Sequence, residues 1–318
     1  MHSVRKKGIQ VILVAMTVAL TATAAWSPAQ AGGAQHSDEG FGPAQKLPSV
    51  INTDAPEGCP IETADGLSLM FASARATGLG GNDIYVSDRD SLASPWKAPA
   101  LLPAPINSPS ADFCPTPVYG RSLFFVSDRP TNAGPTPPCG GGDIYLSRQS
   151  PSGAWSEPAM LECYPNGPNF PGAERSPSLV QTWFGTFLFY SSTGLGTNHD
   201  IYVSRLGRDG KFGPGEVVKE LSTPQYNELM PNVRDRGDGS FEIVFSSDRP
   251  TWGRNQPAFG NQDVYYSRSF WLTGLWSAPV NLGAGINTAT ADQRATLSRD
   301  GKRLYFGSNN DLYVSERR

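Results

Sequence analysis

The sequence predicts an all-β protein, a five-bladed β-propeller with four-stranded antiparallel blades. Three observations support this fold. A phrase of the form Asp-(Ile/Val/Leu)-Tyr-x-Ser recurs about every 50–60 residues, the length of one blade. The same strand-like segments surround each copy, and the one that the last copy lacks is found near the start of the chain. The phrase occupies residues 83–87, 143–147, 200–204, 263–267 and 311–315.

Three strands are expected in the same order in each copy. The innermost segment opens on an acid, followed in four copies by proline three residues later; the acids are Glu57, Asp112, Glu174, Glu228 and Asp292. The second strand is a short run rich in aromatic and branched residues, at 69–71, 123–126, 187–190, 243–245 and 304–306. Asp-Gly pairs before three of these runs, at 65–66, 238–239 and 300–301, predict tight hairpin turns. The recurring phrase forms the third strand.

The fourth strand is marked by an aromatic residue and a nearby proline, as in Trp96 and Pro99. Proline cannot donate to a strand ladder, so this strand belongs at the outer edge of its blade. The fifth copy ends after its third strand, whereas residues 41–47 carry the missing pattern. We therefore expect an N-terminal strand to close the last blade, which leaves no bare sheet edge. The alternative, a row of independent hairpin modules, would not need this N-terminal segment.

Residues 1–31 resemble a secretory signal peptide, with basic residues at 5–7, an apolar core at 9–20 and an Ala-x-Ala cleavage site at 29–31. A retained membrane anchor is the alternative, but threonines dilute the apolar core, so we expect no membrane insertion after cleavage. Residues 32–40 form a polar leader that we expect to be disordered. Residues 41–318 then form a single propeller, secreted to the periplasm or the extracellular space.

The mature chain is acidic. Loss of the three basic residues of the signal peptide takes the formal net charge from −3 to −6. An acidic surface argues against nucleic acid or an anionic membrane as partner. We expect a monomer that binds a protein or a carbohydrate.

All four cysteines lie in the predicted mature chain, and an oxidising compartment favours disulfides. Four cysteines allow three pairings, and sequence does not select one. We favour Cys139–Cys163 as a loop staple, with Cys59–Cys114, at equivalent positions of adjacent copies, as the second bond. A zinc site is disfavoured because no Cys-x-x-Cys spacing is present.

The five inner acids should surround one mouth of the central channel, since they open the innermost strands. Two interpretations remain open. In one, the acids are structural clips, paired with arginines that end the second strand in three copies: Arg75, Arg129 and Arg249. In the other, these carboxylates and arginines bind a polar ligand or a cation, and a ring of hard oxygen ligands would suit Ca²⁺.

Aromatic residues in long loops are further ligand-binding candidates. Trp252 and Phe259 lie between the second and third strands of the fourth copy, and Tyr226 lies in the connection that precedes Glu228. Long loops over a rigid scaffold often carry binding residues. Aromatic rings over a carboxylate-lined mouth would suit stacking on a sugar or gripping a peptide. The alternative is that they cover small cores of their own loops.

The repeat resembles that of WD-like β-propellers of TolB type. The resemblance rests on Pro231, Asp238-Gly239, the Phe-Ser-Ser-Asp-Arg run at 245–249 and Asp263-Val264-Tyr265, and on residues 297–306 of the last copy. It covers essentially residues 41–318. It implies a periplasmic or envelope-associated binding scaffold.

Two functions follow from these observations. The preferred one is a secreted or periplasmic binding scaffold that recognises a protein or glycan at the loop-rich mouth. The alternative is a glycoside hydrolase-like enzyme, because five-bladed glycosidases place a general acid and a nucleophile or base on inner strands. Carboxylates about 5 or 6.5–9.5 Å apart are required, and the candidates are Glu57, Asp112, Glu174 and Glu228. The same acid in every copy indicates a repeat residue, so the balance leans against an enzyme.

Overall fold

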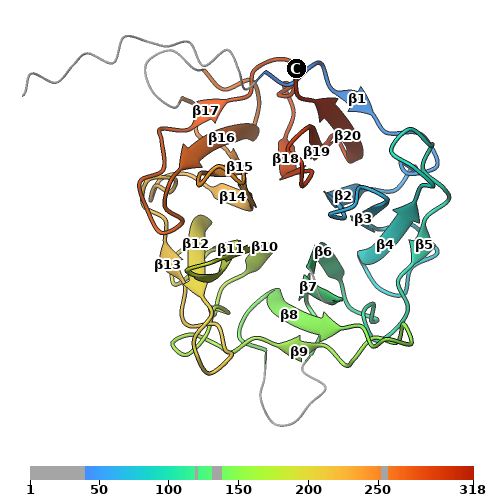
Figure 1. The fold of residues 1–318 in the computed structure, drawn as a ribbon, viewed down its shortest axis with the longest axis horizontal. Helices are drawn as coiled ribbons and strands as arrows, with labels where there is room; N and C mark the ends of the chain where they lie inside the picture. The colour runs from blue at the N-terminus through green and yellow to red at the C-terminus, as the bar shows by residue number, and fades with distance from the viewer. Residues whose placement is uncertain (1–39, 119–120, 131–137, 252–256) are drawn as a thin grey trace, which may run out of the picture. The chain divides into compact units, whose positions relative to one another are not determined.

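The computed structural model describes residues 40–118, 121–130, 138–251 and 257–318. These residues form five four-stranded antiparallel sheets arranged as the blades of a ring (Figure 1). The predicted all-β, five-bladed propeller is confirmed. Within the described ranges, no helix is long and apolar enough to span a membrane.

Each blade is built from consecutive strands, with the innermost strand first; only the fifth takes its outer strand from elsewhere in the chain. Blade one contains β2 (Glu57–Glu62), β3 (Ser68–Ser73), β4 (Asp83–Asp88) and β5 (Ala100–Leu101). Blade two contains β6 (Asp112–Val118), β7 (Ser122–Ser127), β8 (Asp143–Arg148) and β9 (Ala159–Met160). Blade three contains β10 (Glu174–Thr182), β11 (Gly185–Ser192), β12 (Asp200–Arg205) and β13 (Glu216–Val217). Blade four contains β14 (Glu228–Asp235), β15 (Phe241–Ser247), β16 (Asp263–Ser269) and β17 (Val280–Asn281). Blade five contains β18 (Asp292–Leu297), β19 (Arg303–Ser308), β20 (Asp311–Glu316) and β1 (Gln45–Lys46).

The N-terminal strand closes the ring as predicted. In Figure 1, β1 (blue) lies beside β20 (dark red) in the fifth blade. The backbone N–H of Gly42 donates to the carbonyl of Glu316 at 2.8 Å, and that of Leu47 donates to the carbonyl of Leu312 at 2.9 Å. The Leu47 side chain is buried in a cluster that includes Phe71 of blade one. The segment therefore also seals the seam between the last blade and the first.

The core lies between the blades and is largely aromatic. The tyrosine of the recurring phrase stacks on a phenylalanine of the second strand, as Tyr85 does on Phe71 with ring centroids 6.1 Å apart. Equivalent pairs occur in blades two, four and five. The repeated tryptophans contact these clusters, and Trp276 of blade four meets Phe189 of blade three edge-on. The phrase recurs because each blade needs the same face to pack against its neighbour.

Each inner strand shifts register just after its acid. The second residue after the acid has positive φ, between 45° and 60°, although none of the five is glycine; these residues are Cys59, Cys114, Ser176, Met230 and Arg294. A non-glycine residue in this region of φ is uncommon and costs about 1–2 kcal/mol. The repeated bulge brings these five residues to the centre of the channel.

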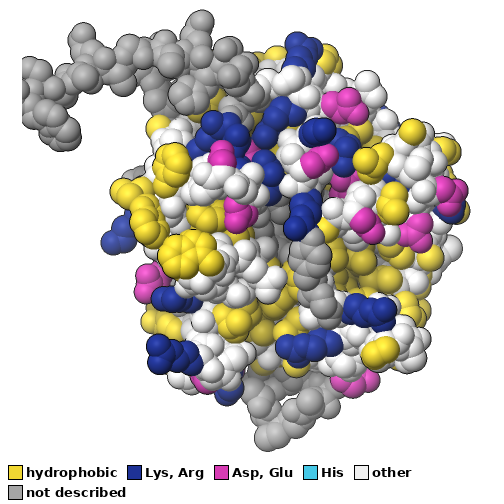
Figure 2. All heavy atoms as spheres, viewed as in Figure 1, with side chains coloured by type: hydrophobic (Ala, Val, Ile, Leu, Met, Phe, Trp, Pro, Cys, Tyr) yellow, Lys and Arg dark blue, Asp and Glu magenta, His cyan; other side chains and the backbone are white. Residues whose placement is uncertain are grey.

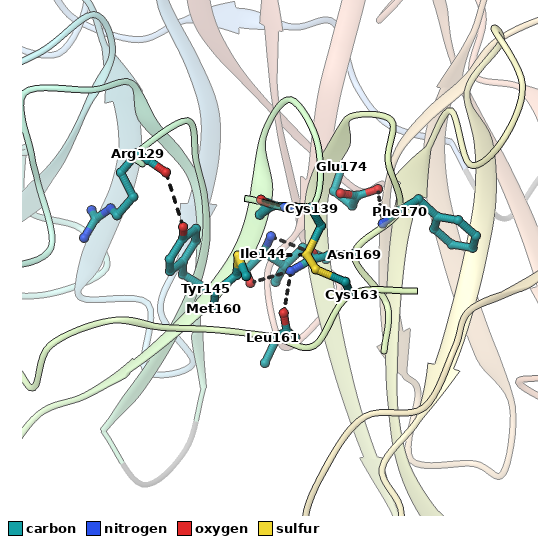
Figure 3. Close-up of a disulfide and its surroundings, with 11 residues drawn as sticks. Arg129, Cys139, Ile144, Tyr145, Met160, Leu161, Cys163, Asn169, Phe170 and Glu174 are labelled. Atoms are coloured by element: carbon teal, nitrogen blue, oxygen red, sulfur yellow. Dashed lines mark hydrogen bonds between the residues drawn. A yellow bond between two sulfur atoms is a disulfide. The ribbon is translucent and has the colours of Figure 1, made fainter. Parts of the chain in front are cut away.

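Both expected disulfides are present. Cys59–Cys114 joins the inner strands of blades one and two. Cys139–Cys163 links the β7–β8 loop of blade two to the connection between blades two and three, beside Asn169 (Figure 3). Cys59 and Cys114 can pair because they occupy the same bulge position on the neighbouring strands β2 and β6. The predicted signal peptide and almost all of the leader lie outside the described residues.

Candidate functional site

The channel has three sections in a row. The mouth where the inner strands begin, here called the acid-side mouth, is a cavity of about 520 Å³ lined by Arg175, His199, Asn227, Asp248, Gln262 and Gln293, among others. Beneath it is a neck of about 20 Å³, lined by Cys59, Cys114, Ser176, Met230 and Arg294, among others. The far mouth is a cavity of about 790 Å³ lined by Glu62, Gln181, Arg234 and Arg299, among others. Met230 lines both of the first two sections, which places the neck directly below the acid-side mouth.

Three of the five inner acids are paired with the predicted arginines. Arg75 contacts Glu57 at 3.2 Å. The corresponding pairs in blades two and four, Arg129–Asp112 at 2.6 Å and Arg249–Glu228 at 2.7 Å, have buried carboxylates. These three acids therefore act as clips inside their own blades.

All five acids also hold the loop that precedes their strand. Each carboxylate accepts a hydrogen bond from a backbone N–H four or five residues upstream; the donors are Thr53, Ser108, Phe170, Thr223 and Thr288. The serine that ends the second strand donates to the same carboxylate in four blades, as Ser127 does to Asp112 at 2.5 Å. Each acid thus fixes the preceding loop to the start of its inner strand, at the base of the mouth.

This arrangement does not support the alternative interpretation, in which the ring of acids binds Ca²⁺. Most of the acid oxygens accept hydrogen bonds from backbone N–H, hydroxyl or arginine groups, and Glu174 Oε2 and Asp292 Oδ1 are buried without a partner among the described residues. Across the described ranges, no group of three or more His, Cys, Asp or Glu residues is placed to hold a metal ion. Arg175 and Arg294 also bring positive charge to the channel, which would repel a cation.

Glu174 differs from the other acids. Blades one, two and four have an arginine two residues after the serine that ends the second strand. In blade three that serine is Ser192, and Gly194 takes the place of the arginine. The Oε1 atom of Glu174 accepts from the Ser192 hydroxyl at 2.6 Å. The same atom accepts from the Phe170 N–H at 3.2 Å (Figure 3). Its Oε2 atom is buried and has no hydrogen-bond partner in the described part of the chain. Burial raises the pKa of Glu174 to about 8, so this carboxyl is protonated at neutral pH.

Asp292 is the other inner acid without an arginine clip. It accepts from the Thr288 N–H at 2.5 Å and from the Thr288 hydroxyl at 3.0 Å. Burial raises its pKa too, and the nearby Ser308 hydroxyl lowers it. Glu174 and Asp292 therefore keep their protons to a higher pH than the same side chains do in water.

Polar side chains that the sequence did not single out line the acid-side mouth. Asp248 accepts from the backbone N–H of Asn227 at 2.8 Å and from its side-chain Nδ2 at 2.7 Å. Arg175 donates to the carbonyl of Glu174 at 2.7 Å and covers the Phe113 ring. Burial, followed by the charge of Arg175, lowers the pKa of His199, so this imidazole is neutral at pH 7. A sequence signal existed for Asp248, since Asp also precedes the clip arginine in blade two.

The predicted aromatic residues are spread around this end. The guanidinium of Arg249 lies 5.8 Å from the centre of the Tyr226 ring, so Tyr226 is next to the clip of blade four. Phe259 is 43% exposed, and its backbone N–H donates to Asp263. Trp252 lies outside the described residues.

A second aromatic surface, which the sequence analysis missed, lies on blades three and four. Trp183, in the turn between β10 and β11, is 94% exposed. It contacts Phe184, whose ring lies 6.2 Å from that of Trp271. Figure 2 shows hydrophobic side chains gathered at the left, where Figure 1 has blades three and four. Because β10 begins at the acid-side mouth, its other end carries this surface near the far mouth.

A repeated polar residue that was not predicted from the sequence joins neighbouring blades. The side chains of four asparagines and one serine accept a hydrogen bond from the third strand of the preceding blade; they are Asn52, Asn107, Asn169, Ser222 and Asn287. Asn169 in addition donates to the carbonyls of Ile144 and Leu161 (Figure 3). The Ile-Asn pairs at 51–52, 106–107 and 286–287 were the available signal.

No family model and no curated protein matches this sequence. Solved structures do resemble it. An endo-arabinase from Bacteroides thetaiotaomicron is 17% identical with a TM-score of 0.55, over 86% of this chain and 96% of that one. A GH43 endo-arabinanase from Bacillus licheniformis is 15% identical with a TM-score of 0.54, over 84% and 95%. An α-L-arabinofuranosidase from Podospora anserina, solved with cellotriose, is 12% identical with a TM-score of 0.56, over 88% and 98%.

These comparisons correct two predictions. The resemblance to TolB-type repeats is wrong, because the structures that match are propellers of sugar-cleaving enzymes. The preferred function, a binding scaffold, depended on that resemblance and is wrong with it. The short strand motifs misled because any propeller needs the same hairpin turns and the same aromatic packing between blades. At these identities the likeness itself extends to the fold only.

Proposed function

We propose that this protein is a glycoside hydrolase with its active site at the acid-side mouth. The observation that carries the proposal is Glu174, an inner-strand carboxyl whose pKa is raised to about 8 and whose Oε2 atom has no partner among the described residues. The similar folds of sugar-cleaving enzymes support this as an analogy of architecture.

Cleavage of a glycosidic bond needs a proton donor for the departing oxygen and a second carboxylate. A donor must keep its proton at the working pH, which an ordinary glutamate does not. Glu174 meets this requirement through burial. Its side chain is fully buried beneath the mouth, so a rotation toward the mouth would bring Oε2–H to the glycosidic oxygen, which takes the proton as the bond to the anomeric carbon breaks. Glu57, Asp112 and Glu228 suit this role less because arginines hold their carboxylates.

Asp248 would be the second carboxylate. It lines the acid-side mouth, and Asn227 orients it through two hydrogen bonds. An oriented carboxylate can take the proton of an attacking water or attack the anomeric carbon directly. Placing the proton donor and the carboxylate on β10 and at the end of β15 sets them on rigid elements of adjacent blades.

The lining of the mouth suits a neutral sugar. Gln262, Gln293 and Asn227 offer amides, and neutral His199 offers an imidazole, to sugar hydroxyls. A cavity of about 520 Å³ is within the range of small-ligand sites. The enzymes of similar fold act on arabinan and on α-L-arabinofuranosides by name, so α-L-arabinofuranosyl linkages are the first substrate class to test.

The test compares sugar release by the wild-type chain and by Glu174→Gln, on linear arabinan, arabinoxylan and dinitrophenyl α-L-arabinofuranoside. Loss of a general acid costs about 10²–10⁴-fold, and we expect that loss in kcat on the polysaccharides. The dinitrophenyl leaving group departs without a proton, so its hydrolysis should change far less. Glu216→Gln, an exposed glutamate on β13, is the matched control and should keep full activity.

Two results would overturn the proposal. One is a wild-type protein that releases no sugar from any of these substrates. The other is a folded Glu174→Gln variant that cleaves arabinan at the wild-type rate.

We also propose that the chain is exported to the periplasm or the extracellular space. Two disulfides favour an oxidising compartment, and residues 1–31 have the sequence of a signal peptide. N-terminal sequencing of protein recovered after export should find a first residue close to Gly32; a retained Met1 would contradict it.

A further inference from the structure

Arg294 extends into the neck of the channel from the bulge of β18, with a φ of 60°. The guanidinium of Arg294 packs closely against the main chain of β2. A Cβ atom at Gly58 on β2 would lie 2.0 Å from Nη1 of Arg294, so any larger residue at position 58 would collide with it. Met230 occupies the equivalent bulge position on the neighbouring inner strand β14, and Ser176 does so on β10, one blade further round the ring.

The Arg294 guanidinium has no partner in the residues that the structure describes. Its Nε atom is buried without an acceptor, and its side chain makes neither a hydrogen bond nor an ion pair there. Arg75, Arg129 and Arg249 differ sharply, since each contacts a carboxylate within 3.2 Å. Burial, followed by the nearby charge of Arg175, lowers the pKa of Arg294 to about 10. It therefore stays charged at neutral pH.

The Arg294 side chain is partly buried, with its Nε atom enclosed. A charge that is withdrawn from water without a counter-charge is unfavourable, and proteins normally pair it or coordinate it. No residue that lines the neck is an acid. Ser176 donates its hydroxyl proton to Cys114 Sγ at 3.2 Å, and Cys59 and Cys114 form a disulfide. Asp292, two residues earlier on the same strand, is turned toward Thr288. Among the described residues, no acid is therefore placed to balance the charge of Arg294.

The neck limits what can supply a balancing charge. At about 20 Å³ it has room for about one water-sized group, so a phosphate ester or a whole sugar does not fit. It is reached from the acid-side mouth past Met230, with Arg175 beside that approach.

We propose that the neck of the channel is a binding site for a small anion, of chloride or single-carboxylate size, held by Arg294 with Arg175 as a second cation. Among the five described bulge residues of the inner strands, Arg294 is the one that carries a charge, and the anion would neutralise it. This site lies below the mouth assigned to the hydrolase and does not depend on that function. Its tests need no sugar turnover.

The first test is crystallography of the full protein after soaking in sodium bromide, with anomalous diffraction at the bromine edge. We expect a bromide peak in hydrogen-bonding contact with the Arg294 guanidinium. Density for water alone at that position, with bromide peaks elsewhere on the surface, would overturn the proposal. This test uses the wild-type chain, so it stands even if a variant fails to fold.

The second test measures thermal stability at constant ionic strength while sodium isethionate, whose anion is too large for the neck, is replaced by sodium bromide. We expect the melting temperature of the wild-type protein to rise with bromide, because an anion that binds the folded state stabilises it. Arg294→Met removes the charge at similar volume and should abolish this dependence. Arg148→Met, at an exposed arginine on β8, should retain it.

A parallel titration with sodium acetate distinguishes the sources of the anion. A rise with bromide alone identifies a free monatomic ion, and a rise with acetate as well identifies a site that accepts a carboxylate group. Equal responses of the wild-type protein and Arg294→Met to both salts would contradict the proposal.

Discussion

At the scale of single residues, Glu174 and Asp112 show how one neighbour sets the chemistry of a repeated acid. Both open an inner strand, and both accept hydrogen bonds from an upstream N–H and from a serine. Asp112 also has Arg129 at 2.6 Å, whereas Gly194 occupies the matching position in blade three. Without that cation, burial dominates and raises the pKa of Glu174. A single difference between blades thus replaces an arginine-paired carboxylate with a carboxyl that keeps its proton, the group that we propose as the proton donor.

The raised pKa predicts how stability depends on pH. In the unfolded chain Glu174 titrates near 4.5, and in the folded protein near 8. Between these values the folded state holds one more proton than the unfolded state, so its contribution to stability is lost as pH rises from about 5 to about 8. We expect the melting temperature of the wild-type protein to fall relative to Glu174→Gln over this interval. Parallel melting curves for the two proteins would contradict it.

The location of the acids could be predicted from the sequence, but their roles could not. Their position before each hydrophobic run placed them at one mouth, and the arginines three to four positions past that run suggested the clips. Whether a carboxylate turns to the channel or back to its own loop depends on the bulge that follows it, and no local pattern announces that bulge at Cys59 or Met230. The isolation of Arg294 depends on contacts among five strands far apart in the chain.

At the scale of single elements, the clip joins an inner strand, the strand behind it and the loop before it. In blade two, Arg129 contacts Asp112 and also donates to the carbonyl of Pro105 at 2.9 Å. The loop from β5 to β6 is thereby fixed to the end of β7. Such a link makes the acid-side mouth a rigid frame, which a binding or catalytic site requires.

Removing one member of a buried clip should therefore be costly. Arg129→Ala leaves the Asp112 carboxylate buried without its cation, and breaking a pair in this way costs about 3–5 kcal/mol. Chemical denaturation should show a loss of that size in the free energy of unfolding. The control is Lys211→Ala, which breaks the exposed pair of Lys211 with Glu162 and should leave unfolding almost unchanged. Equal effects of the two substitutions would show that the clip does not stabilise the blade.

At the scale of the whole propeller, closure depends on a strand taken from the other end of the described chain. Residues 41–47 pair with β20 and bury Leu47 against blade one. This was the part of the fold that the sequence predicted best. The repeat had a gap at its end and a matching fragment at its start, and an open sheet edge is unfavourable. The kind of protein could not be predicted in the same way. The repeated residues form the packing between blades, which many propellers share, and they do not determine the chemistry of the mouth.

The closing strand gives a direct test of this architecture. A chain that starts at residue 48 should melt at a lower temperature than one that starts at residue 40, and should associate through the exposed edge of β20. Calorimetry and light scattering of the two truncated proteins measure both effects. The same melting temperature and a monomeric state for both would show that the ring does not need this strand.

The repeated bulge leaves the five central positions of the propeller open to exchange. The backbone there is the same in every blade, yet the side chains are two cysteines, a serine, a methionine and an arginine. Since the main chain does not select among them, mutation can recombine thiol, hydroxyl, thioether and guanidinium groups around one axis without disturbing any sheet. The chemistry at the centre of the propeller is therefore set by side chains alone, on a main chain that has the same conformation in all five blades.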